Sequence, residues 1–410
     1  MSGLANQLVV AEREEVARGV RLLLARPLIE ERGSPDEFDL VRRRRLPITL
    51  WFDYYCGWQV LVEPRLGYAR LFKVRAATDP TRPARRLRSG RAPFDRRRYV
   101  LLCVVAAELL TVPVITIGML ADRVATATAT DSVLADFEPA VRAERRAFVD
   151  VLRLLESYGV LEVVDGSTDA YVDAVTAKAL YQVDATLLLR LLAAPVGPSR
   201  LAVPVEEVPL RWEELLVAAS RERRYGEADD GRPVSSTQRN LWLRHAVFRR
   251  LVDDPVLYFD DLTSDERGYL TSPTGRQLLR RAAREGGFVA DERAEGVLFV
   301  DPDGIATDSR FPDDAAVPRV AGLLLLDRLD RAVTVEQLHG VASDLLERFP
   351  RWAGQYQEAG GAPQLVGDAL AVLAGHGLVR VAAGLVHPLP AAARYAVGGI
   401  RTGPIQEAST

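Results

Sequence analysis

Cysteine and lysine are both scarce in this chain of 410 residues. Only Cys56 and Cys103 are present, which excludes a disulfide framework or a cysteine-rich zinc site and fits a reducing compartment. Lys73 and Lys178 are the only lysines, so nearly all positive charge is arginine. Because the net charge is −3, any contact with nucleic acid must come from local basic patches rather than from the whole chain.

Targeting and membrane signals are also missing. Met1 to Arg13 lacks the basic region and apolar core of a signal peptide. The longest apolar stretch, Tyr99 to Ala121, contains Glu108, which would cost roughly 2.5–3.5 kcal/mol in hydrocarbon, and Pro113, which indicates a turn. The pattern predicts a buried helix, a turn and a second helix rather than a membrane span, and we expect a cytoplasmic protein.

No catalytic motif is present. The chain lacks G-x-x-x-x-G-K-[ST], G-x-G-x-x-G, H-E-x-x-H and G-x-S-x-G, and its four histidines have no metal-ligand spacing. Acidic pairs are the best basis for an enzyme, but they lie in turn-rich stretches where aspartate is favoured for capping: Asp253-Asp254, Asp260-Asp261, Asp301-x-Asp303 and Asp313-Asp314. We therefore expect no catalytic residue, no metal site and no cofactor.

What is present is enough apolar surface for two or three domains. Hydrophobic residues make up 48% of the chain and charged residues 27%, as in a globular protein.

An internal repeat appears when the chain is compared with itself at an offset of 218. Ile115 to Leu120 aligns with Val333 to Leu338, and Leu155 to Val163 aligns with Leu373 to Val381, both without a gap. Two units of about 45 residues therefore share one layout.

Local signals define that layout. Thr116 and Thr334 stand where a helix N-cap is expected, and Gln337 completes a capping box in the second copy. Gly159 and Gly377 end apolar-periodic helices and lead into alternating apolar residues. In the first predicted hairpin, the strand Leu161 to Val163 pairs with a return strand at Tyr171 to Val175. In the second, Val379 to Val381 pairs with a return strand at Leu385 to His387.

Helix, turn, helix, longer helix and β-hairpin is the order of a winged helix. The opening helices are Tyr99 to Leu110 and Pro318 to Leu329. Weaker echoes begin at Gly57, with a return strand at Tyr68 to Val74, and at Gly287, returning through Val297 to Val300. Each echo is either a further degenerate winged helix or an unrelated helix and hairpin.

The predicted fold is mainly α with short β-hairpins, built from tandem winged-helix domains with additional helical and hairpin segments. The segments are 1–80, helical with a hairpin; 81–215, the first winged helix with a basic entry loop; 216–314, a middle helical and hairpin region; and 315–410, the second winged helix.

Arginines gather at the first winged helix. The stretch before it is predicted to be a loop because of Pro83, Gly90 and Pro93, and it is opposed only by Asp95. Its basic residues are Arg82, Arg85, Arg86, Arg88, Arg91, Arg96, Arg97 and Arg98. Such a loop suits contact with a nucleic-acid backbone, although basic runs also bind acidic proteins or are simply solvated.

The helix Pro139 to Tyr158 occupies the recognition position of the first unit. Phe148, Val151, Leu152 and Leu155 fall on one face, whereas Arg142, Arg146 and Arg153 fall on the other. The arginine face suits phosphate contact, or else it is a solvated face with ion pairs to Glu144, Asp150 and Glu156. The corresponding helix Gln364 to His376 has no arginine or lysine and fits packing against protein better.

These features resemble the KITE (MukE-like) family, the tandem winged-helix subunits that sit on the kleisin of bacterial SMC complexes. Leu241 to Tyr258, reading LWLRHAVFRRLVDDPVLY, and Leu155 to Gly166 are similar to the B subunits of type II Wadjet plasmid-defence systems. The resemblance implies a non-catalytic, nucleoid- or plasmid-associated subunit that forms a dimer. It implies three protein partners, a kleisin-like subunit, an SMC-like ATPase and a Toprim-type nuclease, together with double-stranded DNA bound without sequence preference.

A free-standing winged-helix transcription regulator is the alternative. A regulator should bind one DNA sequence by itself, whereas an SMC subunit should bind weakly and without preference.

Overall fold

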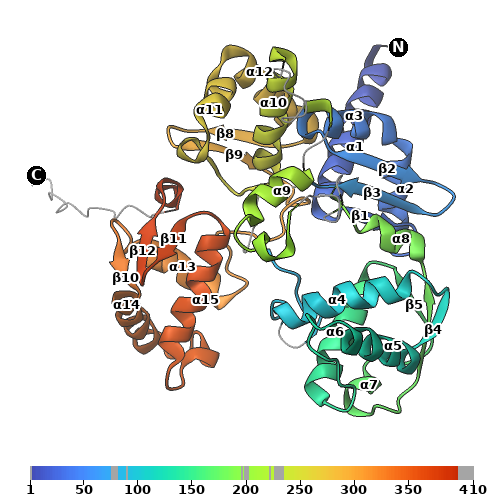
Figure 1. Cartoon of the computed structure of the whole chain (residues 1–410). Coiled ribbons are helices and arrows are strands. Elements are labelled where there is room, and N and C mark those ends of the chain that lie inside the picture. The colour runs from blue at the N-terminus through green and yellow to red at the C-terminus, as the bar shows by residue number, and fades with distance from the viewer. Residues whose placement is uncertain are drawn as a thin grey trace, which may run out of the picture. The chain divides into compact units, whose positions relative to one another are not determined.

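The computed structural model describes residues 2–74, 82–88, 91–194, 197, 203–220, 223–225 and 235–395. The chain divides into two compact units. The first comprises Met1–Arg26, Arg43–Gly57 and Arg223–Thr410, and the second comprises Pro27–Arg42 and Trp58–Glu222. The fold is mainly helical with small antiparallel sheets, as the sequence predicted (Figure 1).

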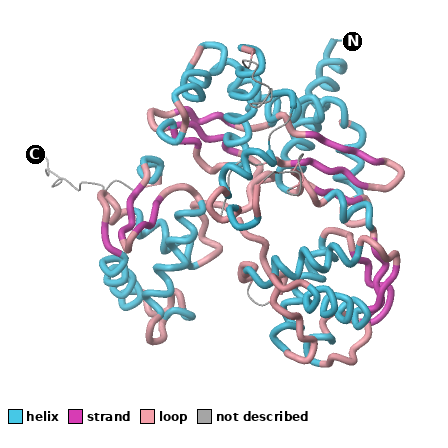
Figure 2. Tube along the Cα trace, viewed as in Figure 1, coloured by secondary structure: helices cyan, strands magenta, loops and turns pink. Residues whose placement is uncertain are grey.

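Four three-stranded sheets share one topology. In each, the first strand pairs with the third and the third pairs with the second, giving the orders β1-β3-β2, β4-β6-β5, β7-β9-β8 and β10-β12-β11. All these pairings are antiparallel. Figure 2 shows the strands in these small groups, joined by helices and loops. With one helix before the first strand and two between the first and second, each group follows winged-helix order, and we call the four groups repeats 1 to 4.

Repeats 1 and 2 occupy the N-terminal half of the chain. The elements of repeat 1 are α1 (Ser2–Ala25), β1 (Leu28–Glu30), α2 (Pro35–Arg43), α3 (Arg45–Cys56), β2 (Gln59–Glu63) and β3 (Tyr68–Phe72). The elements of repeat 2 are α4 (Arg96–Leu109), β4 (Val114–Thr116), α5 (Ile117–Thr130), α6 (Arg142–Ser157), β5 (Leu161–Gly166), α7 (Ala170–Asp173) and β6 (Ala179–Val183). Repeat 2 lies in the second unit, whereas repeat 1 places α1 and α3 in the first unit and its sheet in the second.

Repeats 3 and 4 lie in the first unit. After α8 (Ala185–Arg190), η2 (Val205–Glu207), α9 (Trp212–Ser220) and η3 (Arg223–Tyr225), repeat 3 has α10 (Ser236–Asp253), β7 (Leu257–Tyr258), η4 (Phe259–Asp261), α11 (Ser264–Thr271), α12 (Pro273–Gly286), β8 (Val289–Glu292) and β9 (Gly296–Val300). Repeat 4 has α13 (Val317–Leu326), β10 (Val333–Thr334), α14 (Val335–Arg348), η5 (Gly354–Tyr356), α15 (Gly361–Gly375), β11 (Val379–Ala382), β12 (Leu385–Pro388) and then η6 (Pro390–Arg394). The two weaker sequence echoes are therefore the hairpins of two further repeats.

A left-handed glycine ends the last helix of every repeat. Gly57, Gly159, Gly287 and Gly377 have φ values of 63°, 65°, 75° and 66°. In repeats 2, 3 and 4 the N–H of the next residue donates to the carbonyl five positions earlier, as in a Schellman motif. Only glycine adopts this conformation without steric cost, so the same residue redirects each chain into its hairpin.

The predicted N-caps are confirmed. The Thr116 hydroxyl accepts from the Met119 N–H, and Thr334 and Gln337 form a complete capping box. Thr263 and Glu266 form another capping box at the start of α11, at the equivalent place in repeat 3.

At the offset of 218, the buried residues of repeat 2 align with buried residues of repeat 4. In repeat 2 the buried residues include Leu120, Val124, Phe148, Val151, Leu152, Leu155, Val160 and Leu161. Their counterparts in repeat 4 are also buried: Leu338, Ala342, Val366, Ala369, Leu370, Leu373, Leu378 and Val379. The sequence repeat thus marks the residues that hold α5 and α6, or α14 and α15, against each hairpin.

One predicted strand is wrong. Tyr171 to Val175 does not return the hairpin of repeat 2, because Ala170–Asp173 forms α7 and the return strand is β6. Tyr171 is buried, and its ring packs against Phe148 of α6. In β6, every second residue faces the core: Ala179, Tyr181 and Val183. The residues around Tyr171 cannot alternate in this way because they form a helix.

The apolar stretch Tyr99 to Ala121 forms parts of α4, β4 and α5, so the predicted helix, turn and helix is confirmed. Glu108 accepts a hydrogen bond of 2.7 Å from Arg123 Nε. Among the described residues, no helix has both the length and the apolar character needed to span a membrane.

Candidate nucleic-acid interface

The predicted basic loop is shorter than expected. Asp95 caps α4 by accepting from the Arg98 N–H, so Arg96, Arg97 and Arg98 form the first helical turn rather than part of the loop. The described loop residues are 82–88 and 91–95, and a β-bridge joins Arg85 to Pro93. A cap at Asp95 thus fixes three arginines that the proline and glycine pattern had assigned to irregular backbone.

Two of the predicted arginines point inward to one carboxylate. Arg98 Nε lies 2.7 Å from Asp150 on α6, and both side chains are 7% exposed. Arg86 Nε lies 3.8 Å from the same carboxylate. Arg98 also pairs with Asp95 at 2.5 Å. These contacts hold the loop and α4 against α6, so Arg86 and Arg98 stabilise the site rather than present free charge.

Electrostatics at Asp95 follow from this arrangement. Partial burial acts to raise the pKa of Asp95, but the Arg98 N–H and the guanidinium groups of Arg98 and Arg86 together lower it below the ordinary value. The carboxylate therefore stays charged and keeps both its cap and its ion pair.

Other carboxylates bring the loop and the recognition helix together. Arg97 Nη2 lies 2.6 Å from Glu144 on α6. Asp169 forms ion pairs with both Arg88 of the loop and Arg153 of α6. The two clusters that the sequence suggested separately thus form one surface, which we call the basic face.

Pairing leaves part of the basic face available. Arg142 pairs with Asp173 at 2.6 Å, but both side chains are largely exposed. Arg153 is only 12% exposed, and burial, helped by the neighbouring Arg88, lowers the pKa of its guanidinium. Arg82 is exposed. Within the described residues, Arg85, Arg91, Arg96 and Arg146 are exposed and make no ion pair.

Sequence reasoning missed Arg145. It is buried, and its guanidinium donates to the backbone carbonyls of Pro139, Ala140, Tyr171 and Val172 at 2.8–3.1 Å. Helical spacing places Arg145 on the same face as Phe148 and Leu152, which was the available signal. Its role is to fasten α7 and the start of α6 to each other.

The recognition-position helix of repeat 3 was also missed. Arg276, Arg280, Arg281 and Arg284 of α12 are exposed. Arg280 pairs with Glu292 and Arg281 with Glu285, each at 2.8 Å, whereas Arg276 and Arg284 make no ion pair within the described part of the chain. The signal was the segment PTGRQLLRRAAREG, whose arginines share one helical side.

The acidic pairs contact arginines. Asp301 and Asp303 each lie 2.7 Å from Arg21, Asp254 lies 3.1 Å from Arg250 and Asp260 lies 3.5 Å from Arg267. Asp313 pairs with Arg319. No group of three or more metal-ligating side chains occurs among the residues that the structure describes.

His245, within the segment that carries the family resemblance, is buried. Its Nδ1 lies 2.6 Å from the Tyr225 hydroxyl, and Arg249 Nε donates to the Cys56 carbonyl at 2.7 Å. Burial and the nearby Arg224, Arg244 and Arg249 lower the pKa of His245 to about 3. A Cβ at Gly57 would lie 2.3 Å from His245 Nδ1, so this cluster fixes α10 against the end of α3.

Comparison with known proteins places the chain in a family. A family model described as "Protein of unknown function (DUF2398)" matches residues 20–398. No curated protein and no solved structure matches the chain. Since the model covers most of the chain and all of repeats 2 to 4, the chain belongs to the DUF2398 family.

Proposed function

We propose that this chain is a non-catalytic, KITE-type subunit of an SMC-like complex, similar to the B subunit of type II Wadjet systems. In this role it binds a kleisin-like subunit and double-stranded DNA, and it supports ATP-driven DNA loop extrusion in defence against plasmids. The SMC-like ATPase and a Toprim-type nuclease supply the chemistry, and the chain acts as a dimer on plasmid DNA in the cytoplasm.

The observation that carries the proposal is the basic face of repeat 2. Arg85 and Arg91 of the loop, Arg96 at the start of α4 and Arg146 of α6 are exposed and make no ion pair within the described chain, although Arg85 Nη1 donates to the Arg91 carbonyl at 3.2 Å. Carboxylates shared between the loop and α6 hold them on one surface. Guanidinium groups match phosphate oxygens with two hydrogen bonds, and backbone contacts carry no sequence information.

Four winged-helix repeats in one chain also support a subunit role. The recognition-position helices differ in what they expose: arginines on α6 and α12, and only small or uncharged side chains and Asp368 on α15. A surface such as that of α15 suits contact with protein, so one chain can join DNA to other subunits.

The DNA part of the proposal is tested with a four-site variant. Replacing these four exposed arginines by glutamine should weaken binding to every duplex alike. It should also make the dependence of affinity on salt less steep, because a protein that contacts fewer phosphates releases fewer counterions. The matched control replaces exposed arginines that also lack an ion pair within the described chain. The test set is Arg85, Arg91, Arg96 and Arg146, and the control set is Arg18, Arg45, Arg328 and Arg331.

Fluorescence anisotropy with two unrelated 30-base-pair duplexes at several salt concentrations measures this. Equal binding by the test and control variants would remove the basic face as the DNA site. Tight binding to one duplex alone would favour the transcription regulator instead.

The partner part is tested by purifying the tagged chain from its host. We expect an SMC-type ATPase and a kleisin-like subunit to accompany it, whereas a regulator would come alone. The purified chain should neither hydrolyse ATP nor cut plasmid DNA with Mg²⁺. Cleavage that disappears in Asp253→Asn or Asp260→Asn would contradict the non-catalytic assignment.

A further inference from the structure

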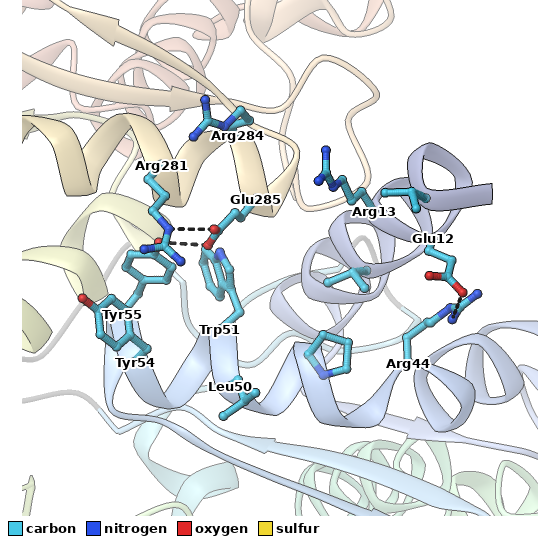
Figure 3. A pocket seen from close by; sticks show the side chains of 13 residues that line it. Glu12, Arg13, Arg44, Leu50, Trp51, Tyr54, Tyr55, Arg281, Arg284 and Glu285 are labelled. Carbon is cyan, nitrogen blue, oxygen red and sulfur yellow. Dashed lines mark hydrogen bonds and ion pairs between the residues drawn. The ribbon is translucent and has the colours of Figure 1, made fainter. Parts of the chain in front are cut away.

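The first unit contains a cleft that the basic face does not use. It measures about 980 Å³ and is lined by α1, α3 and α12 (Figure 3). Trp51 of α3 closes its floor, being buried and donating from Nε1 to the Ala282 carbonyl at 3.3 Å. Tyr55 donates to Glu285 at 2.9 Å, which fixes α3 to α12. The cleft is therefore held by defined contacts within one unit.

The α3 side of the cleft is apolar and exposed. Leu50 and Tyr54 line the cleft and are 67% and 40% exposed. Leu46, one turn before Leu50 and 70% exposed, extends them along α3 into one stripe about 12 Å long. Val9 of α1 adds an apolar side chain that is 45% exposed. Although α3 holds the recognition position of repeat 1, this stripe offers no charge to phosphate.

The rim carries unbalanced positive charge. Arg44 is neutralised by Glu12 and Glu15 at 3.0 and 2.7 Å, and Arg281 by Glu285. Arg13 of α1 and Arg284 of α12 are exposed and make no ion pair within the described chain. Outside the lining, the Arg244 guanidinium lies 4.1 Å from the centre of the Tyr54 ring. Figure 3 shows Arg13 and Arg284 on the two helices that flank α3.

We propose that this cleft binds an acidic, amphipathic helical segment of a partner protein. Its apolar side chains lie on Leu46, Leu50 and Tyr54, and carboxylates on either side of its apolar face pair with Arg13 and Arg284. A helix bound in a groove presents its anchors at positions i, i+3, i+4 and i+7, and this row is about as long as the α3 stripe. Protein–DNA interfaces are more polar, so exposed leucines favour a protein over a duplex.

The inference rests on the proposed function, because it gives the docking chemistry for one protein partner of the assembly. A photo-crosslinking amino acid, p-benzoylphenylalanine, placed at Leu50 in the full chain tests it in the host. The same group at Met119, which is 61% exposed on α5, is the control position. We expect position 50, and not position 119, to crosslink to a partner segment that has one apolar face flanked by glutamate or aspartate, identified by mass spectrometry.

Charge reversal then separates docking from mere proximity. Arg13→Glu with Arg284→Glu should reduce the crosslink from position 50 at least tenfold, whereas Arg18→Glu with Arg276→Glu, exposed on the same two helices, should leave it unchanged. Thermal melting checks that both variants stay folded.

Several results would overturn the inference: crosslinks to DNA, to a second copy of this chain or to a basic segment, no crosslink at position 50, or a crosslink that charge reversal leaves intact. If the SMC-type and kleisin-like subunits still accompany the chain in that case, only the cleft assignment fails. If the unmodified chain brings no such subunit, the proposed function itself fails.

Discussion

At an offset of 218, buried Leu152 of α6 corresponds to buried Leu370 of α15, whereas exposed Arg146 corresponds to exposed Gln364. Repeats 2 and 4 therefore share the positions that are buried in the fold and differ in the residues that are exposed to solvent. Arg142, Arg146 and Arg153 are replaced by Gly360, Gln364 and Ala371. The comparison teaches that the winged-helix frame depends on the buried residues and the left-handed glycine, and leaves the exposed face of the recognition helix free to acquire a separate role.

The two repeats also differ in the burial and the partners of an aspartate that both have at the same position. Asp150 and Asp368 occupy the same position at this offset. Asp150 is buried between Arg98 and Arg86, whereas Asp368 is exposed and accepts 2.8 Å from the Tyr356 hydroxyl. Repeat 2 thus contains a buried ionic contact where repeat 4 has a single surface hydrogen bond.

The largest expected effect tests that difference. Asp150→Asn should lower the free energy of unfolding by about 3 kcal/mol, because Arg98 would remain buried without its main partner. The value lies at the lower end for a buried pair because Asp95 still contacts Arg98. Asp368→Asn should cost about 1 kcal/mol or less, since the amide oxygen still accepts from Tyr356. Urea unfolding measures both, and equal costs would show that the two carboxylates are equivalent.

A second prediction extends the comparison to repeat 3, where a buried titratable group, His245, has no anionic partner among the residues that the structure describes. His245 has a pKa of about 3 in the folded chain and about 6.5 when unfolded. Between these pH values the unfolded chain binds more protons than the folded chain. The contribution of His245 to the free energy of unfolding is therefore fully present above pH 6.5, and it falls by about 1.4 kcal/mol for each pH unit below that value.

His245→Gln removes this contribution. The variant should be less stable than the parent at pH 7, and the gap should shrink by about 2 kcal/mol at pH 5 because only the parent has a histidine to protonate. Urea unfolding at the two pH values provides the measurement. A constant gap would mean that the pKa of His245 is the same in the folded and the unfolded chain.

The third prediction concerns the feature that the repeats share. Gly159→Ala and Gly377→Ala should each cost about 1–2 kcal/mol, because alanine strains the left-handed conformation. A Cβ at Gly159 also meets the Glu30 carboxylate at 1.9 Å, whereas at Gly377 the nearest atom is 3.4 Å away, so Gly159→Ala should cost slightly more.

Gly367→Ala is the matched control. Gly367 lies within α15 with no atom within 4 Å of an added Cβ, and alanine should stabilise that helix by about 0.5–1 kcal/mol. If Gly377→Ala proved as favourable as Gly367→Ala, the left-handed turn would not be what forces the hairpin.

Local signals explain which parts of this molecule could be predicted. Thr116, Thr334, Gly159 and Gly377 act through hydrogen bonds or dihedral angles within a few residues, so their roles follow from the sequence alone. The return strand of repeat 2 could not be predicted, since the coiling of α7 depends on Tyr171 packing against Phe148.

The candidate site was predictable in composition and not in pairing. The sequence placed Arg98 and Arg153 in basic clusters, but their partners Asp150 and Asp169 are known only once the loop lies along α6. Burial therefore removed Arg86, Arg98 and Arg153 from the free charge of the site. Separately, helix α12 of repeat 3 exposes arginines that its weak sequence echo did not reveal.

The smallest expected effect tests whether charge alone distinguishes the recognition helices. Arg146→Gln should reduce the slope of log affinity for DNA against log salt by about 0.9, the value for one phosphate contact. Gln364→Arg places an arginine at the matching position of α15, where the preceding helix α13 has only Arg319, and that residue pairs with Asp313. We expect no change in slope from Gln364→Arg, because a single guanidinium without a basic loop beside it does not form a surface that binds the phosphate backbone. If Gln364→Arg increased the slope by as much as Arg146→Gln reduces it, the recognition-position helices of both repeats would contact DNA and would differ only in charge.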